Sequence, residues 1–152
     1  MKIALVVIAL LFVLVSAYVR LAPLDVPLLQ SWMSLLPPGE KTWANGHQVV
    51  REMDDPQAEM ARLDAIIMAT PRTTRVQGSV ESGLTSYVTR SALFGFPDFI
   101  TLSAGPDDTI DGGNGPLLRI DGRAVYGKSD LGVNKARIQG WLAQLDGDRP
   151  TQ

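Results

Sequence analysis

An apolar run at residues 3–15 constrains this chain more than any other feature of its sequence. Extended through Val19, the run reaches the lower limit of the roughly 17–25 residues that a membrane-spanning helix needs. Tyr18 falls where an aromatic side chain would meet the lipid head groups, and Arg20 follows just outside. The run therefore predicts a transmembrane anchor over residues 1–20.

A secretory signal sequence is the alternative interpretation of the same run. Such a sequence also has a basic start, a short apolar centre and small residues before its cleavage site, and Val15, Ser16 and Ala17 fit that site. For a retained anchor, Lys2 and the amino group outweigh Arg20 by a narrow margin. We therefore expect a single span of the inner (cytoplasmic) membrane, with the following domain on the periplasmic side.

Residues 21–53 have the composition of a proline-rich linker. A short amphipathic helix is expected within it, because Pro27 suits a first helical position and apolar residues then recur at helical spacing. These apolar residues are Leu28, Leu29, Trp32, Met33 and Leu36. The helix lies either in the membrane interface or against the body of the protein, and the sequence leaves both open. Residues 39–53 are expected to form a loop.

Residues 54–147 carry a helix pattern, then a series of strand patterns, then a second helix pattern. Asp54 or Asp55 caps a helix that runs to about Ala69 and ends before Pro71. The apolar period then falls to two, which predicts strands. The strands are expected at residues 73–80, 84–91, 99–104 and 117–126.

A final helix is expected from Ser129 or Asp130 to about Leu145, followed by a disordered tail at residues 148–152. Because the connections between strands are rich in turn residues, the strands should form an antiparallel meander. The predicted fold is α+β: a two-layer domain with an antiparallel sheet of about four strands packed with two helices, preceded by one N-terminal transmembrane helix.

The composition excludes several classes of function. The chain has no cysteine, so disulfides, thiolate metal sites and thiol nucleophiles are absent. Fourteen Lys and Arg residues nearly balance 16 Asp and Glu residues, for a net charge of −2. No basic cluster is present, so we predict no nucleic-acid partner. No cofactor is expected.

Familiar catalytic and metal-binding motifs are also missing from the sequence. Neither a Gly-rich phosphate loop nor the Gly-x-Ser-x-Gly elbow of hydrolases occurs. His47 is the only histidine, so we expect no metal or catalytic role for it. Residues 107–115 resemble a calcium loop superficially but lack the acidic residue that closes one, so we interpret them as a turn.

Polar residues gather at the ends of the predicted strands and at the start of the last helix. They are Arg90, Asp98, Lys128, Ser129, Asp130, Asn134 and Arg137. Gly127 and Gly132 allow tight backbone geometry beside them. Two interpretations stand: a structural network of Arg and Asp that holds the corner together, or an anion site formed by the cations and the helix N-terminus. The sequence favours the structural network and leaves the anion site open.

Several sequence blocks resemble the domain of unknown function 1499 family. They are Tyr18 to Pro23, Arg62 to Ala65, Thr70 to Thr73, Tyr87 to Ser91, Phe94 to Asp98 and Gly127 to Arg137. Lys128 and Lys135 stand where the family commonly has Arg, which weakens bidentate anion recognition at those two positions. The resemblance implies a membrane-associated bacterial domain and implies no particular activity.

Together these features predict a membrane-anchored periplasmic binding or interaction module of the cell envelope. Its partners would be the membrane and either an envelope protein or a small anionic ligand. The alternatives are an envelope enzyme that uses the Arg and Asp corner, or a structural subunit of a membrane complex. Since no pairing of a nucleophile with a base is visible, the sequence favours binding over catalysis.

Overall fold

The computed structural model describes residues 1–105 and 116–148, so the turn predicted at residues 107–115 and the end of the predicted tail lie outside the described residues. The elements are α1 (Lys2–Leu21), α2 (Val26–Gln30), β1 (Gly39–Trp43), β2 (Gly46–Glu52), α3 (Pro56–Ala69), β3 (Thr73–Ser79), β4 (Leu84–Arg90), β5 (Pro97–Gly105), β6 (Leu117–Ala124) and α4 (Val133–Gly147). This is the predicted α+β class, with the four expected strands and both expected helices present.

The sheet has six strands rather than four. Its order is β1-β2-β6-β5-β4-β3, with every neighbouring pair antiparallel. The expectation of a loop over residues 39–53 was wrong, because β1 and β2 form a hairpin there. The apolar alternation that predicts a strand is missing from β2 for a physical reason: both of its faces are covered. His47 and Gln48 have an exposed fraction of 0% alongside Val49 and Val50 at 3%.

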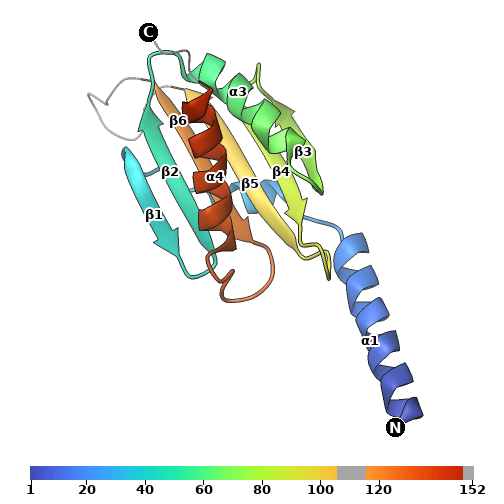
Figure 1. Cartoon of the computed structure of the whole chain (residues 1–152). Coiled ribbons are helices and arrows are strands. Elements are labelled where there is room, and N and C mark those ends of the chain that lie inside the picture. The colour runs from blue at the N-terminus through green and yellow to red at the C-terminus, as the bar shows by residue number, and fades with distance from the viewer. Residues whose placement is uncertain (106–115, 149–152) are drawn as a thin grey trace.

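Helices α3 and α4 lie side by side on one face of the sheet (Figure 1). Asp55 caps α3 as expected, since its Oδ1 accepts a hydrogen bond from the backbone N–H of Ala58 at 2.9 Å. The helices and strands bury one main core between them. That core contains Val49, Met60, Leu63, Ile67, Tyr87, Ile100, Leu102, Leu118, Ile120, Ile138, Trp141, Leu142 and Leu145.

The short helix α2 packs against the opposite face of the sheet, which favours the second of the two expectations for the linker (Figure 1). Leu29 is 5% exposed and contacts Val88 and Phe99. The amide of Gln30 donates a hydrogen bond to the hydroxyl of Ser86 at 2.9 Å. Since this segment shields part of the second face, polar residues of that face are buried.

The last helix begins later than expected, at Val133. Leu131 and Gly132 have φ angles of 54° and 80°, which lie in the left-handed region and prevent an earlier start. Asp130 nevertheless binds the free N–H groups at the start of this helix. Its two carboxylate oxygens accept hydrogen bonds from the backbone N–H groups of Gly132 and Asn134, both at 2.9 Å.

Helix α1 is long and apolar enough to cross a membrane, and a signal sequence near an N-terminus would pass the same test. It projects from the lower end of the body in Figure 1, where β4 ends and β5 begins. Most of its side chains are exposed, but Val19, near its end, is only 4% exposed. The end of α1 therefore contacts the body, whereas the rest of the helix leads away from it.

Candidate functional site

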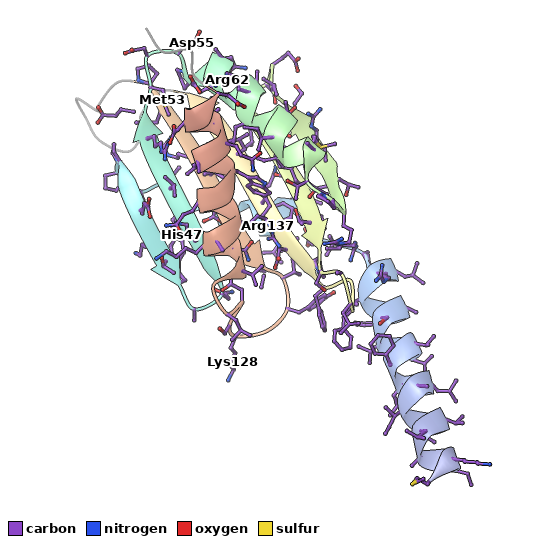
Figure 2. The ribbon with its side chains drawn as sticks, viewed as in Figure 1. His47, Met53, Asp55, Arg62, Lys128 and Arg137 are labelled. Atoms are coloured by element: carbon purple, nitrogen blue, oxygen red, sulfur yellow. The ribbon has the colours of Figure 1, made fainter. Side chains whose placement is uncertain are left out.

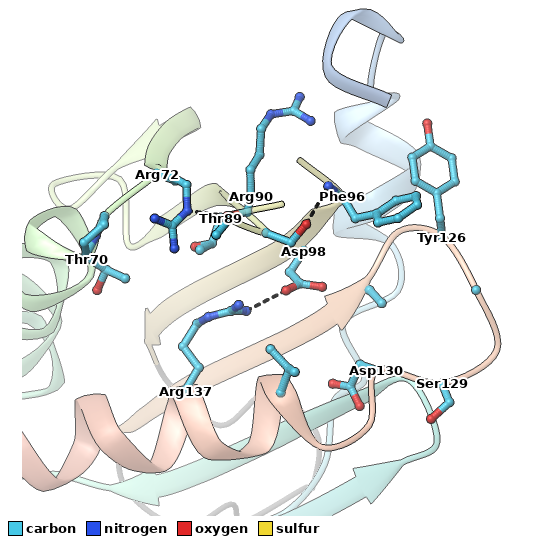
Figure 3. A pocket seen from close by; sticks show the side chains of 16 residues that line it. Thr70, Arg72, Thr89, Arg90, Phe96, Asp98, Tyr126, Ser129, Asp130 and Arg137 are labelled. Carbon is cyan, nitrogen blue, oxygen red and sulfur yellow. Dashed lines mark hydrogen bonds and ion pairs between the residues drawn. The ribbon is translucent and has the colours of Figure 1, made fainter. Parts of the chain in front are cut away.

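A pocket of about 720 Å³ lies at the lower end of the sheet (Figure 3). Its walls come from the α3–β3 junction, the end of β4, the start of β5, the end of β6 and the first turns of α4. The antiparallel order explains this convergence. β4 ends, β5 begins and β6 ends at the same end of the sheet, and the first turns of α4, which follow β6 in the chain, complete the wall.

The structure brings most of the residues predicted from the sequence to this pocket. Five line it: Arg90, Asp98, Ser129, Asp130 and Arg137. Lys128 is exposed and points away from the body (Figure 2). Asn134 is 0% exposed and lies behind Arg137 without lining the pocket.

Arg137 and Asp98 form an ion pair across the pocket wall. Nη1 of Arg137 donates to Oδ2 of Asp98 at 2.9 Å, and also to Oδ1 of Asn134 at 2.8 Å. The side chains of Arg137 and Asp98 are 15% and 13% exposed. A charge-assisted pair that is this sheltered holds α4 against β5. Nη2 of Arg137 has no hydrogen-bond partner among the described residues.

Asp130 is occupied by the backbone of the turn that precedes α4. Burial raises the pKa of Asp130, but the hydrogen bonds from the N–H groups of Asn134 and Gly132 outweigh it and hold the pKa below its ordinary value. The carboxylate therefore stays ionised and occupies the N–H groups that a helix N-terminus offers to an anion. An external anion would have to bind elsewhere in the pocket.

Arg90 lies at the rim of the pocket, and its guanidinium turns toward α1 (Figure 3). Its Nη1 donates hydrogen bonds to the carbonyl oxygens of Val19 at 2.9 Å and Gly95 at 3.0 Å. Arg90 therefore has a structural role through backbone carbonyl oxygens, whereas the predicted pairing of Arg with Asp is made by Arg137 and Asp98.

Arg72 is the charged pocket residue that the sequence analysis missed. Its guanidinium points into the pocket from the side opposite Arg137 (Figure 3), and its Nε donates to the carbonyl oxygen of Arg90 at 3.0 Å. No carboxylate pairs with Arg72 among the residues described. The predicted hairpin held the signal for this position, because the residue before β3 must lie beside the last residue of β4 when the two strands are antiparallel.

The hydroxyl groups of the pocket are held by structural hydrogen bonds. Oγ of Ser129 accepts from the N–H of Leu131 at 3.2 Å, and Oγ of Ser91 accepts from the N–H of Phe96 at 3.0 Å. His47 does not line the pocket; it lies buried in β2 beside Thr42 of β1, and burial lowers its pKa against the opposing effect of Glu40. Within residues 1–105 and 116–148, no group of acidic and histidine side chains could hold a metal ion.

The sequence blocks around this pocket match a known family. A family model described as "Protein of unknown function (DUF1499)" matches residues 37–145. The chain belongs to this family. The DUF1499 domain contains the sheet from β1 onward and every residue that lines the pocket, whereas α1 and α2 lie outside the matched range. No curated protein matches the chain.

Proposed function

We propose that the protein is a binding module whose pocket takes a small anionic ligand. The observation that carries this proposal is the position of Arg72, a cation without a carboxylate partner in the described structure, which faces the pocket opposite Arg137. Guanidinium groups recognise phosphate and carboxylate through two parallel N–H···O bonds, so an arginine that keeps both terminal nitrogens free is suited to an anion.

The charges around the pocket support an anion over a cation. Asp98 is neutralised by Arg137, and Asp130 is neutralised in part by the N–H groups at the start of α4. Arg72 and Arg90 pair with no carboxylate among the described residues, so the balance at the pocket is positive. A volume of about 720 Å³ falls within the range of roughly 300–1,000 Å³ typical of small-molecule sites.

Binding fits the pocket better than catalysis does. The hydroxyl groups of Ser91 and Ser129 accept backbone N–H groups, and no imidazole is among the lining residues. An enzyme that transfers acyl or phosphoryl groups would need a nucleophile beside a base, or a metal.

For the location of the module, we propose that α1 is a retained single span of the inner membrane and that the DUF1499 domain lies on the periplasmic side. Two features of α1 support the retained span. The helix is long and apolar enough to span, and Phe12, which cleavage before Tyr18 would remove, packs its ring against Phe94 of the body at 5.0 Å between centroids. Intact-mass measurement of the membrane fraction tests it: a mature chain that begins at Tyr18 would contradict a retained anchor.

Calorimetric titration of the full chain in non-ionic detergent micelles tests the binding proposal, with inorganic phosphate and then succinate as probes. We expect saturable binding of at least one probe, weakened about ten-fold or more by Arg72→Gln. Lys128→Gln is the matched control, because it removes the same charge from a nearby exposed residue that does not line the pocket. It should leave the affinity within about two-fold.

Two results would refute the proposal. One is the absence of saturable binding for both probes. The other is an equal loss in Arg72→Gln and Lys128→Gln, which would mean that only the overall charge matters. Thermal unfolding of each variant shows that it is folded before the titrations are compared.

A further inference from the structure

The pocket opens beside the end of the apolar helix α1. Arg90 links the two, because it lines the pocket and donates to the carbonyl oxygen of Val19. Arg20 packs against Gly95 so closely that a β-carbon at Gly95 would lie 2.7 Å from its Nε. If α1 spans a bilayer, the mouth of the pocket therefore lies at the level of the lipid head groups.

A row of aromatic rings leads from α1 to the pocket. Ring centroids are 5.0 Å apart for Phe12 and Phe94, 5.6 Å for Phe94 and Phe96, and 6.4 Å for Phe96 and Tyr126. Phe96 and Tyr126 line the pocket and are 39% and 37% exposed. The row makes a continuous apolar path between the helix surface and the pocket.

The loop between β4 and β5 extends along α1 toward the membrane. Phe12, which Phe94 contacts, lies nine residues before Leu21, or about 14 Å along a helix that rises about 1.5 Å per residue. Leu93, beside Phe94, is 65% exposed. An apolar loop tip at this depth would lie among the lipid chains rather than in water.

Backbone hydrogen bonds make the base of this loop suitable for that environment, where an unpaired polar group is costly. The N–H of Ser91 donates to the carbonyl oxygen of Phe96 at 2.9 Å, and the N–H of Gly95 donates to that of Ser91 at 3.2 Å. The carbonyl oxygen of Gly95 accepts from Arg90. The loop is closed on itself while its tip presents apolar side chains.

We propose that the ligand of the pocket is an anionic amphiphile drawn from the bilayer that α1 enters. Its phosphate or carboxylate group binds between Arg72 and Arg137, and its hydrocarbon chain leaves along Phe96 and Tyr126. This inference rests on the proposed anion binding and adds the source of the anion. The lipid is favoured over a free anion because the pocket combines cations among its lining residues with aromatic rings that continue onto α1.

Native mass spectrometry of the full chain in detergent micelles tests the inference, with phosphatidylglycerol and phosphatidylcholine offered in equal amounts. We expect one phosphatidylglycerol to be retained, with about ten-fold preference over phosphatidylcholine. Arg72→Gln should abolish this preference. Phe96→Ser should lower retention about ten-fold while it leaves the calorimetric response to inorganic phosphate or succinate within about two-fold. Leu131→Ser is the control, since Leu131 is 93% exposed but does not line the pocket.

The outcomes separate this inference from the function on which it rests. Binding of phosphate or succinate without a preference for phosphatidylglycerol would overturn the lipid source and keep the anion site. Equal retention of phosphatidylglycerol by Phe96→Ser and by the parent chain would likewise overturn the lipid source and keep the anion site. If neither free anion nor phosphatidylglycerol binds, both proposals fail.

Discussion

Nη1 of Arg90 donates a hydrogen bond to the carbonyl oxygen of Val19 at 2.9 Å, and this contact joins the pocket rim to the end of α1. In a continuing helix the Val19 carbonyl would accept from the residue four positions later, which here is Pro23. Proline has no backbone N–H. Arg90 therefore satisfies a carbonyl that the helix itself leaves without a partner.

Replacement of Arg90 by Met should loosen the end of α1. The variant loses two charge-assisted hydrogen bonds, so the free energy of local opening should fall by about 1–3 kcal/mol. Hydrogen exchange followed by mass spectrometry should show this as faster exchange in peptides covering residues 16–24. Arg51→Met is the matched control, because Arg51 pairs with Asp146 away from the pocket. If both variants exchange alike in that segment, Arg90 does not hold the helix.

Gly95 should resist substitution. Its φ angle of 80° is unfavourable for residues with a β-carbon, and that carbon would meet the side chain of Arg20. Gly95→Ala should lower the free energy of unfolding by about 1–2 kcal/mol. Gly140→Ala is the opposite case, because Gly140 lies within α4 with open space around it. It should raise stability by about 0.5–1 kcal/mol. A stabilising Gly95→Ala would contradict the packing of Arg20.

Replacement of Asp98 by Asn should lower the stability of the fold and raise the affinity for anions. Asp98→Asn removes the charge that neutralises Arg137, so the free energy of unfolding should fall by about 1–3 kcal/mol. The released guanidinium should bind an anion more strongly, so the affinity for inorganic phosphate or succinate should rise several-fold. Thermal unfolding and calorimetry on the same preparation measure both. Lower stability with unchanged affinity would limit Arg137 to a structural role.

The burial of Asp121 leads us to expect that the stability of the folded protein depends on pH. The residue is 4% exposed, and burial raises its pKa to about 6 although Arg123 acts in the opposite direction. The folded state therefore binds a proton that the unfolded state has already released, and stability falls as pH rises between the two pKa values. Above the pKa of Asp121 in the folded state, the stability that this proton contributes is fully lost.

Asp121→Asn should remove this dependence. Relative to the parent chain, the variant should gain on the order of 2 kcal/mol in unfolding free energy between pH 4.5 and pH 7.5. The comparison isolates Asp121, because other groups such as His47 titrate in both proteins. Parallel stability curves for the two proteins would show that the folded pKa of Asp121 is not raised.

The sequence predicted the elements of residues 54–147 better than those of residues 21–53. The capping carboxylate of Asp55 and the strands near residues 73–124 follow from local patterns, and they are present. β2 was missed because His47 and Gln48 are polar yet fully buried, which hides the apolar period, and β1 was missed because its residues are mostly exposed and carry no such period. The sequence predicted the short helix that covers the second face of the sheet but left its position open, so it could not show that this face is covered.

Part of the site could also be predicted from the sequence. Arg90, Asp98 and Arg137 stand at ends of elements, where an antiparallel sheet brings them together. What the sequence did not reveal is which cation is already paired. Arg90 donates a hydrogen bond to a carbonyl oxygen of α1, and Arg137 pairs with Asp98. Only the folded structure shows that Arg72 faces the pocket without a carboxylate partner among the described residues.

A crystal of the full chain soaked in tungstate tests the central claim most directly, because the anomalous signal of tungsten locates an anion without reference to the protein. The account predicts an anomalous peak inside the pocket, within hydrogen-bond distance of Arg72 and Arg137. An empty pocket with peaks only at exposed cations such as Lys128 would contradict it.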